Sequence, residues 1–478
     1  MDTEEFRRLG HRVIDWIADY RATIADRPVA PLTEPGSVRR QLPDRAPEGG
    51  EPLDGFLDDI DRIVAPNLLN WQHPRFFGYF PANASLESLL GDFVSSGLGV
   101  IGLSWQAAPA LVEVEEAVTD WIRDAMGLSP EWQGAIQDTA STSTLIALLC
   151  ARERTTAFGL ARGGLQAEPH ALIVYTSEHG HSSVSKAALL AGFGRDNVRL
   201  VATDDALAMR ADALDAAIRA DRAAGNVPCA VVATTGTTAT TAFDPIGAIG
   251  RVAQDHGTWL HVDAAMAGAA MVLPEHRHLW DGIDGADSLV VNAHKWLGVA
   301  FDASLYYVRD ADHLVKVMGT NPSYLQTAVD GQVRNLRDWG IPLGRRFRAL
   351  KVWAHLRGQG MAAIRERLRR DLADAARFAA IVGATPGWKV VAPVLLQTVC
   401  VRHEPPGLEG EALDAHTRAW CNAVSRSGVA YLAPASVAGR WMVRVSFGSA
   451  MTGPDDIDAL WAAMQAEATR NAPPKPDR

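Results

Sequence analysis

From about residue 90 to residue 310, the sequence alternates between short, continuously apolar runs and longer segments with helical spacing of apolar residues. A strand covered on both faces has no polar alternation, and a connection of helical length lets neighbouring strands run parallel. The alternation therefore predicts an α/β fold whose mostly parallel sheet lies between two layers of helices. The expected strands cover 171–175, 198–201, 230–233, 259–262, 289–291 and 305–308, and the expected helices include 111–126, 145–154 and 345–382.

Two flanking parts differ from this central pattern. Apolar residues recur at helical spacing over 3–25 and 52–69, whereas the proline-rich stretch 27–53 is expected to be an extended arm. These elements bury little by themselves, so we expect the N-terminal segment to pack on another body, such as a partner subunit. The expected units are an N-terminal helical segment (1–85), a large domain (86–380), a small C-terminal α+β domain (381–470) with antiparallel strands near 390–391, 397–401, 431–432 and 441–446, and a disordered tail (471–478).

Composition excludes several classes of protein. A net charge of −10 and a pI near 5.8 disfavour nucleic acid or an anionic membrane as the main partner. The sequence has no apolar run long enough for a membrane span and no apolar signal near its N-terminus. The four cysteines lie far apart in or beside apolar stretches, which is typical of free thiols in a reducing compartment. We therefore expect a cytoplasmic protein.

Polar residues gather directly after four of the expected strands. They are the stretches 177–181 and 234–238, Asp263, and the pair His294 and Lys295. In open α/β sheets, ligands bind outside the carboxyl ends of the strands. The four groups are thus expected to meet at one edge of the sheet.

Lys295 and Asp263 suggest a cofactor for this edge. A lysine just past a buried strand can be a surface residue, but burial and nearby charge can also make its amine a nucleophile. A lysine that forms a Schiff base and an acid that pairs with a pyridinium nitrogen are what a pyridoxal phosphate site needs. The hydroxyl-rich stretch 138–144 precedes an apolar helical run, and it can either cap that helix or bind a phosphate group.

Other ligands fit the sequence less well. No motif of the nucleotide-binding kinds is present, which disfavours a nucleotide. Three pairs (His179 and His181, His261 and Asp263, His276 and His278) have a spacing that could chelate a metal. Without an HExxH motif or a set of cysteine ligands, we expect no metal site.

Seven stretches carry a resemblance to a known family. They are 73–81 (HPRFFGYFP), 102–106 (GLSWQ), 137–141 (QDTAS), 181–183 (HSS), 261–265 (HVDAA), 292–296 (NAHKW) and 341–347 (IPLGRRF). The chain resembles the group II pyridoxal-phosphate-dependent decarboxylases, specifically the aromatic-L-amino-acid (DOPA-type) decarboxylases, and their bacterial branch. The resemblance implies pyridoxal-phosphate-dependent transferase fold type I, as in aspartate aminotransferase, and a homodimer with its sites at the interface.

The resemblance also implies roles for individual residues. Lys295 would carry pyridoxal phosphate, Asp263 would pair with the pyridine nitrogen, and His181 would stack on the ring. Tyr324 would be the lid tyrosine that helps to protonate the substrate carbanion. It directly precedes a polar segment (325–337) that can be a lid or an ordinary loop. The remaining cofactor contacts would be Ala265 on the other ring face, Thr238 close to the cofactor, and Thr139, Ala140, Ser141, Asn292 and His294 at the phosphate.

The implied reaction is decarboxylation of an aromatic L-amino acid to its arylalkylamine and CO2, through an external aldimine and a quinonoid. The residues that resemble the family's aromatic pocket are Trp71, Tyr79, Phe80, Pro81, Ile101, Leu103 and Gly360. The preferred substrate among DOPA, 5-hydroxytryptophan, tryptophan, tyrosine and phenylalanine stays open. Aldehyde synthases of the same family, aminotransferases and non-catalytic pyridoxal phosphate proteins are the alternatives, and the presence of Tyr324 and His181 favours a decarboxylase.

Overall fold

The protein, described here by a computed structural model, is defined over residues 1–320 and 329–472. It divides into two compact units. The first comprises Met1–Pro81, Arg377–Val391 and Cys400–Arg478, and the second comprises Ala82–Ala376 and Ala392–Val399. The N-terminal segment and most of the C-terminal part thus belong to the same unit.

The second unit is built on a seven-stranded sheet in the order β1-β7-β6-β5-β4-β2-β3. Strands β2 to β6 pair in parallel, and β7 pairs antiparallel with both β6 and β1. The expected mostly parallel sheet is confirmed. Its strands are β1 (Gln133–Gln137), β2 (Leu172–Ser177), β3 (Val198–Val201), β4 (Val227–Thr234), β5 (Trp259–Asp263), β6 (Ser288–Asn292) and β7 (Ser304–Val308).

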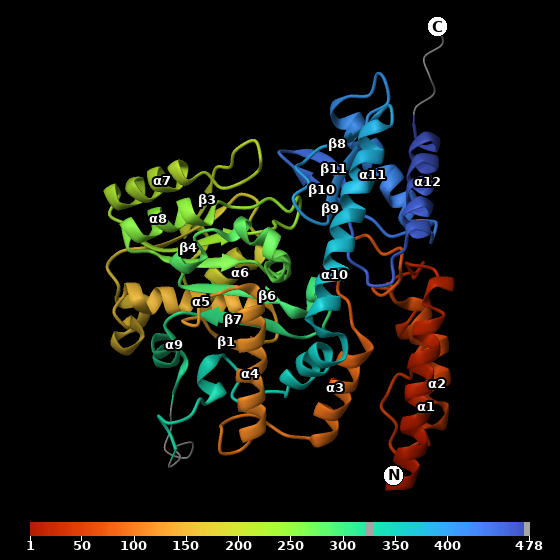
Figure 1. Ribbon diagram of the computed structural model, residues 1–478, viewed down its shortest axis with the longest axis horizontal. Coiled ribbons are helices and arrows are strands. Elements are labelled where there is room, and N and C mark those ends of the chain that lie inside the picture. The colour runs from red at the N-terminus through yellow and green to blue at the C-terminus, as the bar shows by residue number, and fades with distance from the viewer. Residues whose placement is uncertain (321–328, 473–478) are drawn as a thin grey trace. The chain divides into compact units, whose positions relative to one another are not determined.

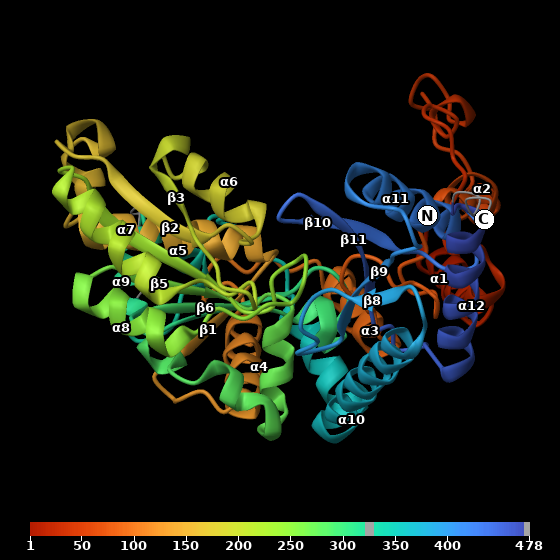
Figure 2. The ribbon, with the colours of Figure 1, turned by 90° about the horizontal axis from the view of Figure 1, so that it is seen from above.

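Helices lie on both faces of this sheet (Figures 1 and 2). Helix α5 packs against α6, and α7 packs against α8. Every residue of β2, β5, β6 and β7 is buried, as the continuous apolar runs predict. The helices of this unit are α3 (Leu86–Leu98), α4 (Pro109–Met126), α5 (Ala140–Thr155), α6 (Ser182–Leu190), α7 (Ala211–Ala223), α8 (Ile246–His256), α9 (Ala311–Met318) and α10 (Ala349–Ala384), the last of which extends into the first unit.

The first unit contains α1 (Thr3–Ala22) and a four-stranded sheet in the order β10-β11-β9-β8. The pairs β8/β9 and β10/β11 are antiparallel, as expected for the C-terminal part. Strand β9 begins at Thr398, two residues inside the second unit. The remaining elements are β8 (Trp388–Val390), β9 (Thr398–His403), α11 (Gly410–Arg426), β10 (Ala433–Val437), β11 (Arg440–Ser446) and α12 (Pro454–Arg470).

Two local predictions were wrong, and one strand was missed. The helix expected over 52–69 is broken into short turns, of which α2 (Phe56–Asp59) is the only α-helical one, and Pro66 lies in the last turn. The strand expected at 431–432 starts at Ala433, while Tyr431 forms an isolated bridge with Phe76. Strand β1 was not expected at all.

Candidate active site

The carboxyl ends of four parallel strands meet at one edge of the larger sheet. Strand β4 ends at Thr234, β5 at Asp263 and β6 at Asn292, while β2 ends at Ser177. In register, Thr234 pairs with Asp263, and Asp263 pairs with Val290. The polar residues expected at this edge are therefore brought together by the sheet itself.

Lys295 lies in a single turn, Ala293–Leu297, that connects β6 to β7. Its backbone angles (φ −103°, ψ −119°) interrupt the helical winding of that turn. The side chain is half-buried, whereas its neighbours His294 and Trp296 are fully buried. Lys295 therefore belongs to a packed turn and is not an ordinary exposed surface lysine.

Asp263 and Lys295 both act on His181. The imidazole caps the start of α6, where Nδ1 accepts the Ser183 N–H at 3.2 Å. His181 is exposed at its surface, but partial desolvation of the ring lowers its pKa. The carboxylate of Asp263 raises this pKa and the positive charge of Lys295 lowers it further, with a net lowering. The three groups implied for ring binding therefore share one electrostatic environment, in which His181 is neutral at neutral pH.

Asp263 is held at a fixed orientation. Its carboxylate accepts the Ala265 N–H at 3.1 Å, and its carbonyl accepts the Thr235 N–H at 2.9 Å. Both Asp263 and Ala265 are buried. Ala265 in turn accepts the Asn292 N–H at 2.9 Å, which ties the turn after β5 to the end of β6.

The residues expected to bind phosphate lie at the start of α5 and beside it. Helix α5 begins at Ala140, five residues earlier than expected, so Ala140 and Ser141 form its first turn. Thr139 is its extended N-cap and makes no side-chain capping bond. The first-turn N–H groups and the helix dipole thus remain available to an anion.

Asn292 and His294 are the other residues expected at the phosphate. The Ser143 hydroxyl lies 3.4 Å from that of Ser304, the residue that pairs with Asn292 in the sheet. His294 Nδ1 accepts the Ala303 N–H at 2.9 Å, so the proton of the neutral ring is on Nε2. Burial, with Lys295 second, lowers the pKa of His294 to about 4, which keeps the imidazole a neutral donor.

One buried atom tests whether a phosphorylated cofactor fits. Asn292 is buried, and its Oδ1 has no hydrogen-bond partner among the described residues. The Thr234 hydroxyl, one strand away from Asp263, is in the same state. Buried polar atoms normally have partners, so this edge of the sheet is built to receive a polar ligand. The residues present fit pyridoxal phosphate.

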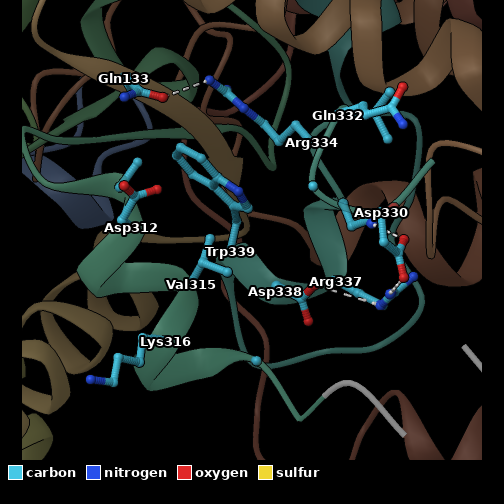
Figure 3. Close-up of a pocket in the computed structure, with 15 residues that line it drawn as sticks. Gln133, Asp312, Val315, Lys316, Asp330, Gln332, Arg334, Arg337, Asp338 and Trp339 are labelled. Carbon is cyan, nitrogen blue, oxygen red and sulfur yellow. Dashed lines mark hydrogen bonds and ion pairs between the residues drawn. The ribbon is translucent and has the colours of Figure 1, made fainter. Parts of the chain in front are cut away.

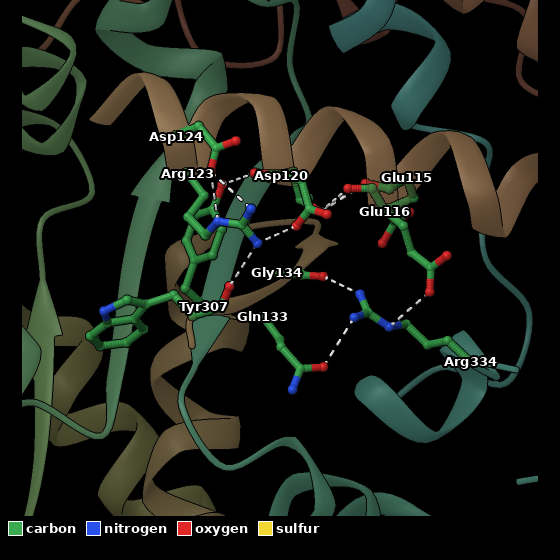
Figure 4. Close-up of polar contacts among 11 residues, drawn as sticks. Glu115, Glu116, Asp120, Arg123, Asp124, Gln133, Gly134, Tyr307 and Arg334 are labelled. Carbon is green, nitrogen blue, oxygen red and sulfur yellow. Dashed lines mark hydrogen bonds and ion pairs between the residues drawn. The ribbon is translucent and has the colours of Figure 1, made fainter. Parts of the chain in front are cut away.

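The remaining predicted residues are placed less tightly. Thr238 is exposed in the loop after β4. Tyr324 lies outside the described residues. Of the segment 325–337, residues from 329 onward are described, and Arg334 anchors them to α4 and β1: its guanidinium donates to Gly134 O at 2.8 Å and lies 3.1 Å from Glu116 (Figure 4). This end of the segment is thus attached to the main body of the unit.

The residues expected to line the substrate pocket fall in both compact units. In the first, the Trp71 and Tyr79 rings stack with centroids 5.4 Å apart, both partly exposed, while Phe80 is buried. In the second, Ile101 is exposed, Leu103 half-buried, and Gly360 interrupts α10 with φ +74°. Pro81 is buried in the first unit. Sequence reasoning missed Tyr431, whose hydroxyl donates to that of Tyr79 at 3.2 Å; no motif marks it.

A separate cavity of about 490 Å³ contains none of the residues expected to bind cofactor or substrate, but it is lined in part by the segment 325–337. It lies between α9 and residues 330–339, with Lys316, Arg337 and Asp338 in its wall (Figure 3). Buried Arg337 lies 3.6 Å from Asp338 and 4.0 Å from Asp330, so its charge is balanced within the wall.

Over the described residues, no cluster of three or more metal-ligating side chains is found. No helix in that part of the chain could cross a membrane either.

Comparison with known proteins identifies the family to which the chain belongs. The family model described as the pyridoxal-dependent decarboxylase conserved domain matches residues 35–404. The chain therefore belongs to the pyridoxal-dependent decarboxylase family, whose cofactor is pyridoxal phosphate.

Particular members are similar over nearly the full length. The chain is 37% identical to phenylacetaldehyde synthase of Arabidopsis thaliana, covering 98% of this chain and 97% of that protein. It is 40% identical to tyrosine decarboxylase of Oryza sativa subsp. japonica, covering 98% and 92%. Among solved structures, Oryza sativa TDC with PLP and tryptamine superposes with a TM-score of 0.95 at 32% identity, covering 98% and 99%. Because these relatives are plant proteins, the expected placement in a bacterial branch is not supported.

Proposed function

We propose that the chain decarboxylates an aromatic L-amino acid to the corresponding arylalkylamine and CO2, with pyridoxal phosphate bound to Lys295. The observation that carries the proposal is the convergence of Lys295, Asp263 and His181 beside a phosphate cradle with unpaired buried polar atoms. When bound, the cofactor supplies the electron sink that accepts the electrons of the Cα–carboxylate bond as that bond breaks. The residues of this chain would supply binding, orientation and proton transfer.

Each of the described residues has a task that its position supports, and the task of Tyr324 is the one that the family resemblance implies. The carboxylate of Asp263, held by the Ala265 N–H, would keep the pyridine nitrogen protonated. Neutral His181 would cover the ring, and His294 would donate its Nε2 proton to the phosphate. Tyr324 would deliver the proton to the substrate carbon. Trp71 and Tyr79 resemble the family's aromatic pocket, and their stacked rings form a surface of the kind that suits an aromatic side chain.

The test is a panel of amino acids with the purified, cofactor-loaded protein. We expect CO2 and the matching amine from tyrosine, tryptophan, DOPA, 5-hydroxytryptophan or phenylalanine, and no product from glutamate or aspartate. Product from the acidic amino acids alone would overturn the aromatic assignment. A keto acid without CO2 would indicate an aminotransferase.

Aldehyde synthesis is the second candidate, and one observation favours it: the 37% identity to a phenylacetaldehyde synthase. Formation of aldehyde, ammonia and peroxide in place of amine would support it. Tyrosine at position 324 and histidine at 181 favour the amine.

We also infer a homodimer, because α1 has no buried residue. We infer a cytoplasmic location as well, because all four cysteines are free and buried.

A further inference from the structure

The two peptide groups that follow Lys295 are held by side chains from a distant helix. Trp296 O accepts a bond from Arg367 Nη2 at 2.6 Å, and Leu297 O accepts one from the same nitrogen at 3.0 Å. Arg367 lies on α10, 72 positions after Lys295, and its side chain is mostly buried, with 10% of its surface exposed. A guanidinium fixes carbonyl groups in a plane, because its donors form a rigid fork.

Asp371 holds the same turn at a second point. Its Oδ2 accepts the Trp296 indole N–H at 2.8 Å and lies 3.5 Å from Arg367 Nη1. Trp296 is itself fully buried. One turn of α10 thus contacts both the backbone and the side chain of the residue next to Lys295, and the buried charge of Arg367 is balanced by Asp371.

His355 and Gly298 close the other side of the turn. His355 donates its Nε2 proton to Leu297 O at 3.1 Å, and its Nδ1 accepts from the Ser85 hydroxyl at 2.8 Å. A Cβ added at Gly298 would lie 3.2 Å from both His355 and Arg367, so the glycine permits this close approach. On the N-terminal side, the His294 N–H donates to Ala303 O at 3.2 Å. Lys295 therefore lies between two anchored stretches, and its own carbonyl accepts the Gly298 N–H at 3.2 Å.

We propose that Arg367, balanced by Asp371, is a positioning residue that sets the orientation of the Lys295 amine. This inference rests on the proposed function, in which Lys295 binds the cofactor. Arg367 is not a catalytic residue, since it contacts Asp371 and the peptide carbonyls that follow the lysine. Displacement of a reacting group by about an ångström can lower a rate on the order of a hundredfold. The contacts of Arg367 and Asp371 with the turn, which we call the brace, therefore control how the Lys295 amine reaches the cofactor.

The experiment follows the visible absorbance band of lysine-bound pyridoxal phosphate, without any amino acid present. Two quantities are measured: the pH midpoint of the band, and the rate at which hydroxylamine removes it. The variants are Arg367→Met, Arg367→Lys and Asp371→Asn. The matched control is Arg369→Met, on the same helix, which removes only an exposed ion pair with Glu275.

We expect Arg367→Met to move the pH midpoint by about one unit and to speed loss of the band about tenfold. Arg367→Lys and Asp371→Asn should give smaller changes, and Arg369→Met should match the wild type. A purely structural role would lower the melting temperature and leave both quantities unchanged in the folded protein. If Arg367→Met does not fold, the two conservative variants decide in the same way.

Two failures can be told apart. A wild-type band with unchanged midpoints and rates in all three variants overturns the brace and leaves the proposed function intact. A wild-type protein that shows no band after loading with pyridoxal phosphate overturns both. A band that is present in a wild type acting on other amino acids overturns only the substrate assignment.

Discussion

Lys295 is the residue on which the proposed chemistry depends. Changing Lys295 to Ala should abolish turnover, because the amine that influences His181 and would bind the cofactor is lost. Borohydride reduction followed by mass spectrometry should then find no covalently attached cofactor. Lys186→Ala, an exposed lysine on α6, is the control and should retain attachment and rate. Full activity of the Lys295→Ala protein would refute the assignment.

Tyr324 decides the product in the proposed mechanism. Tyr324→Phe removes the hydroxyl that would protonate the substrate carbon, so the carbanion should persist long enough to react with oxygen. We expect the amine rate to fall by at least about tenfold, consistent with the loss of one general acid, while aldehyde and peroxide rise. The measurement is chromatography of amine and aldehyde with a coupled peroxide assay. Unchanged amine at the wild-type rate would exclude this role.

At the residue scale, the sequence identified the candidate groups but not what holds them. Lys295 and Asp263 were visible because each follows an apolar run. Arg367 and Tyr431 were not visible, because a contact between residues 71 or 352 positions apart leaves no periodic pattern. The family resemblance supplied roles for known positions and gave no information about these two.

At the element scale, buried strands were predictable because a short apolar run between polar segments is typical of a strand covered on both faces. Strand β1 was missed because Gln133 and Gln137 make it look polar and Gly134 interrupts it. The buried side chain of Gln137 has a hydrogen-bond partner far along the chain, because it donates to Trp339 O at 2.7 Å. The start of α5 was missed because Ser and Thr favour caps, yet here they continue the helix.

Helix α3 approaches α10 closely at Gly91. A Cβ there would lie 2.6 Å from both Leu350 O and Lys351 Cα, so Gly91→Ala must push the helices apart. We expect a loss of about 1–3 kcal/mol in the free energy of unfolding, measured by denaturant titration. Gly97→Ala, on the same helix with open space around it, should be neutral or slightly stabilising. Equal effects of the two substitutions would contradict this account of the packing.

The β9–α11 corner of the first unit should weaken in acid. His403 Nδ1 lies 2.9 Å from His416 Nε2, and burial, then His416, lowers the pKa of His403 to about 4. Below the unfolded value of about 6.5 the unfolded chain binds protons that the folded pair does not. Stability from this pair is therefore complete above that value and is lost as the pH falls toward 4.

His403→Gln tests this dependence, since an amide can still donate to His416. Unfolding by urea, followed by tryptophan fluorescence, should show a smaller fall in midpoint between pH about 7 and about 5 than in the wild type. Trp388 reports the local change because its ring centroid lies 4.9 Å from that of His403. Parallel pH curves for the two proteins would exclude the pair as the source.

At the scale of the whole molecule, α1 is a helix without a buried residue. It places Phe6, Val13 and Ile14 on one face, and Phe6 is 67% exposed. An amphipathic helix normally buries its apolar face, so a partner subunit is expected to cover it.

Light scattering should give twice the chain mass of 51.4 kDa for the wild type. Phe6→Glu with Ile14→Glu should weaken the dimer about tenfold or more, because charge would be buried at its contact. Asp15→Lys, on the opposite face of α1, should leave the mass unchanged. A wild-type protein at 51.4 kDa at all concentrations would exclude the dimer and require another partner for this face.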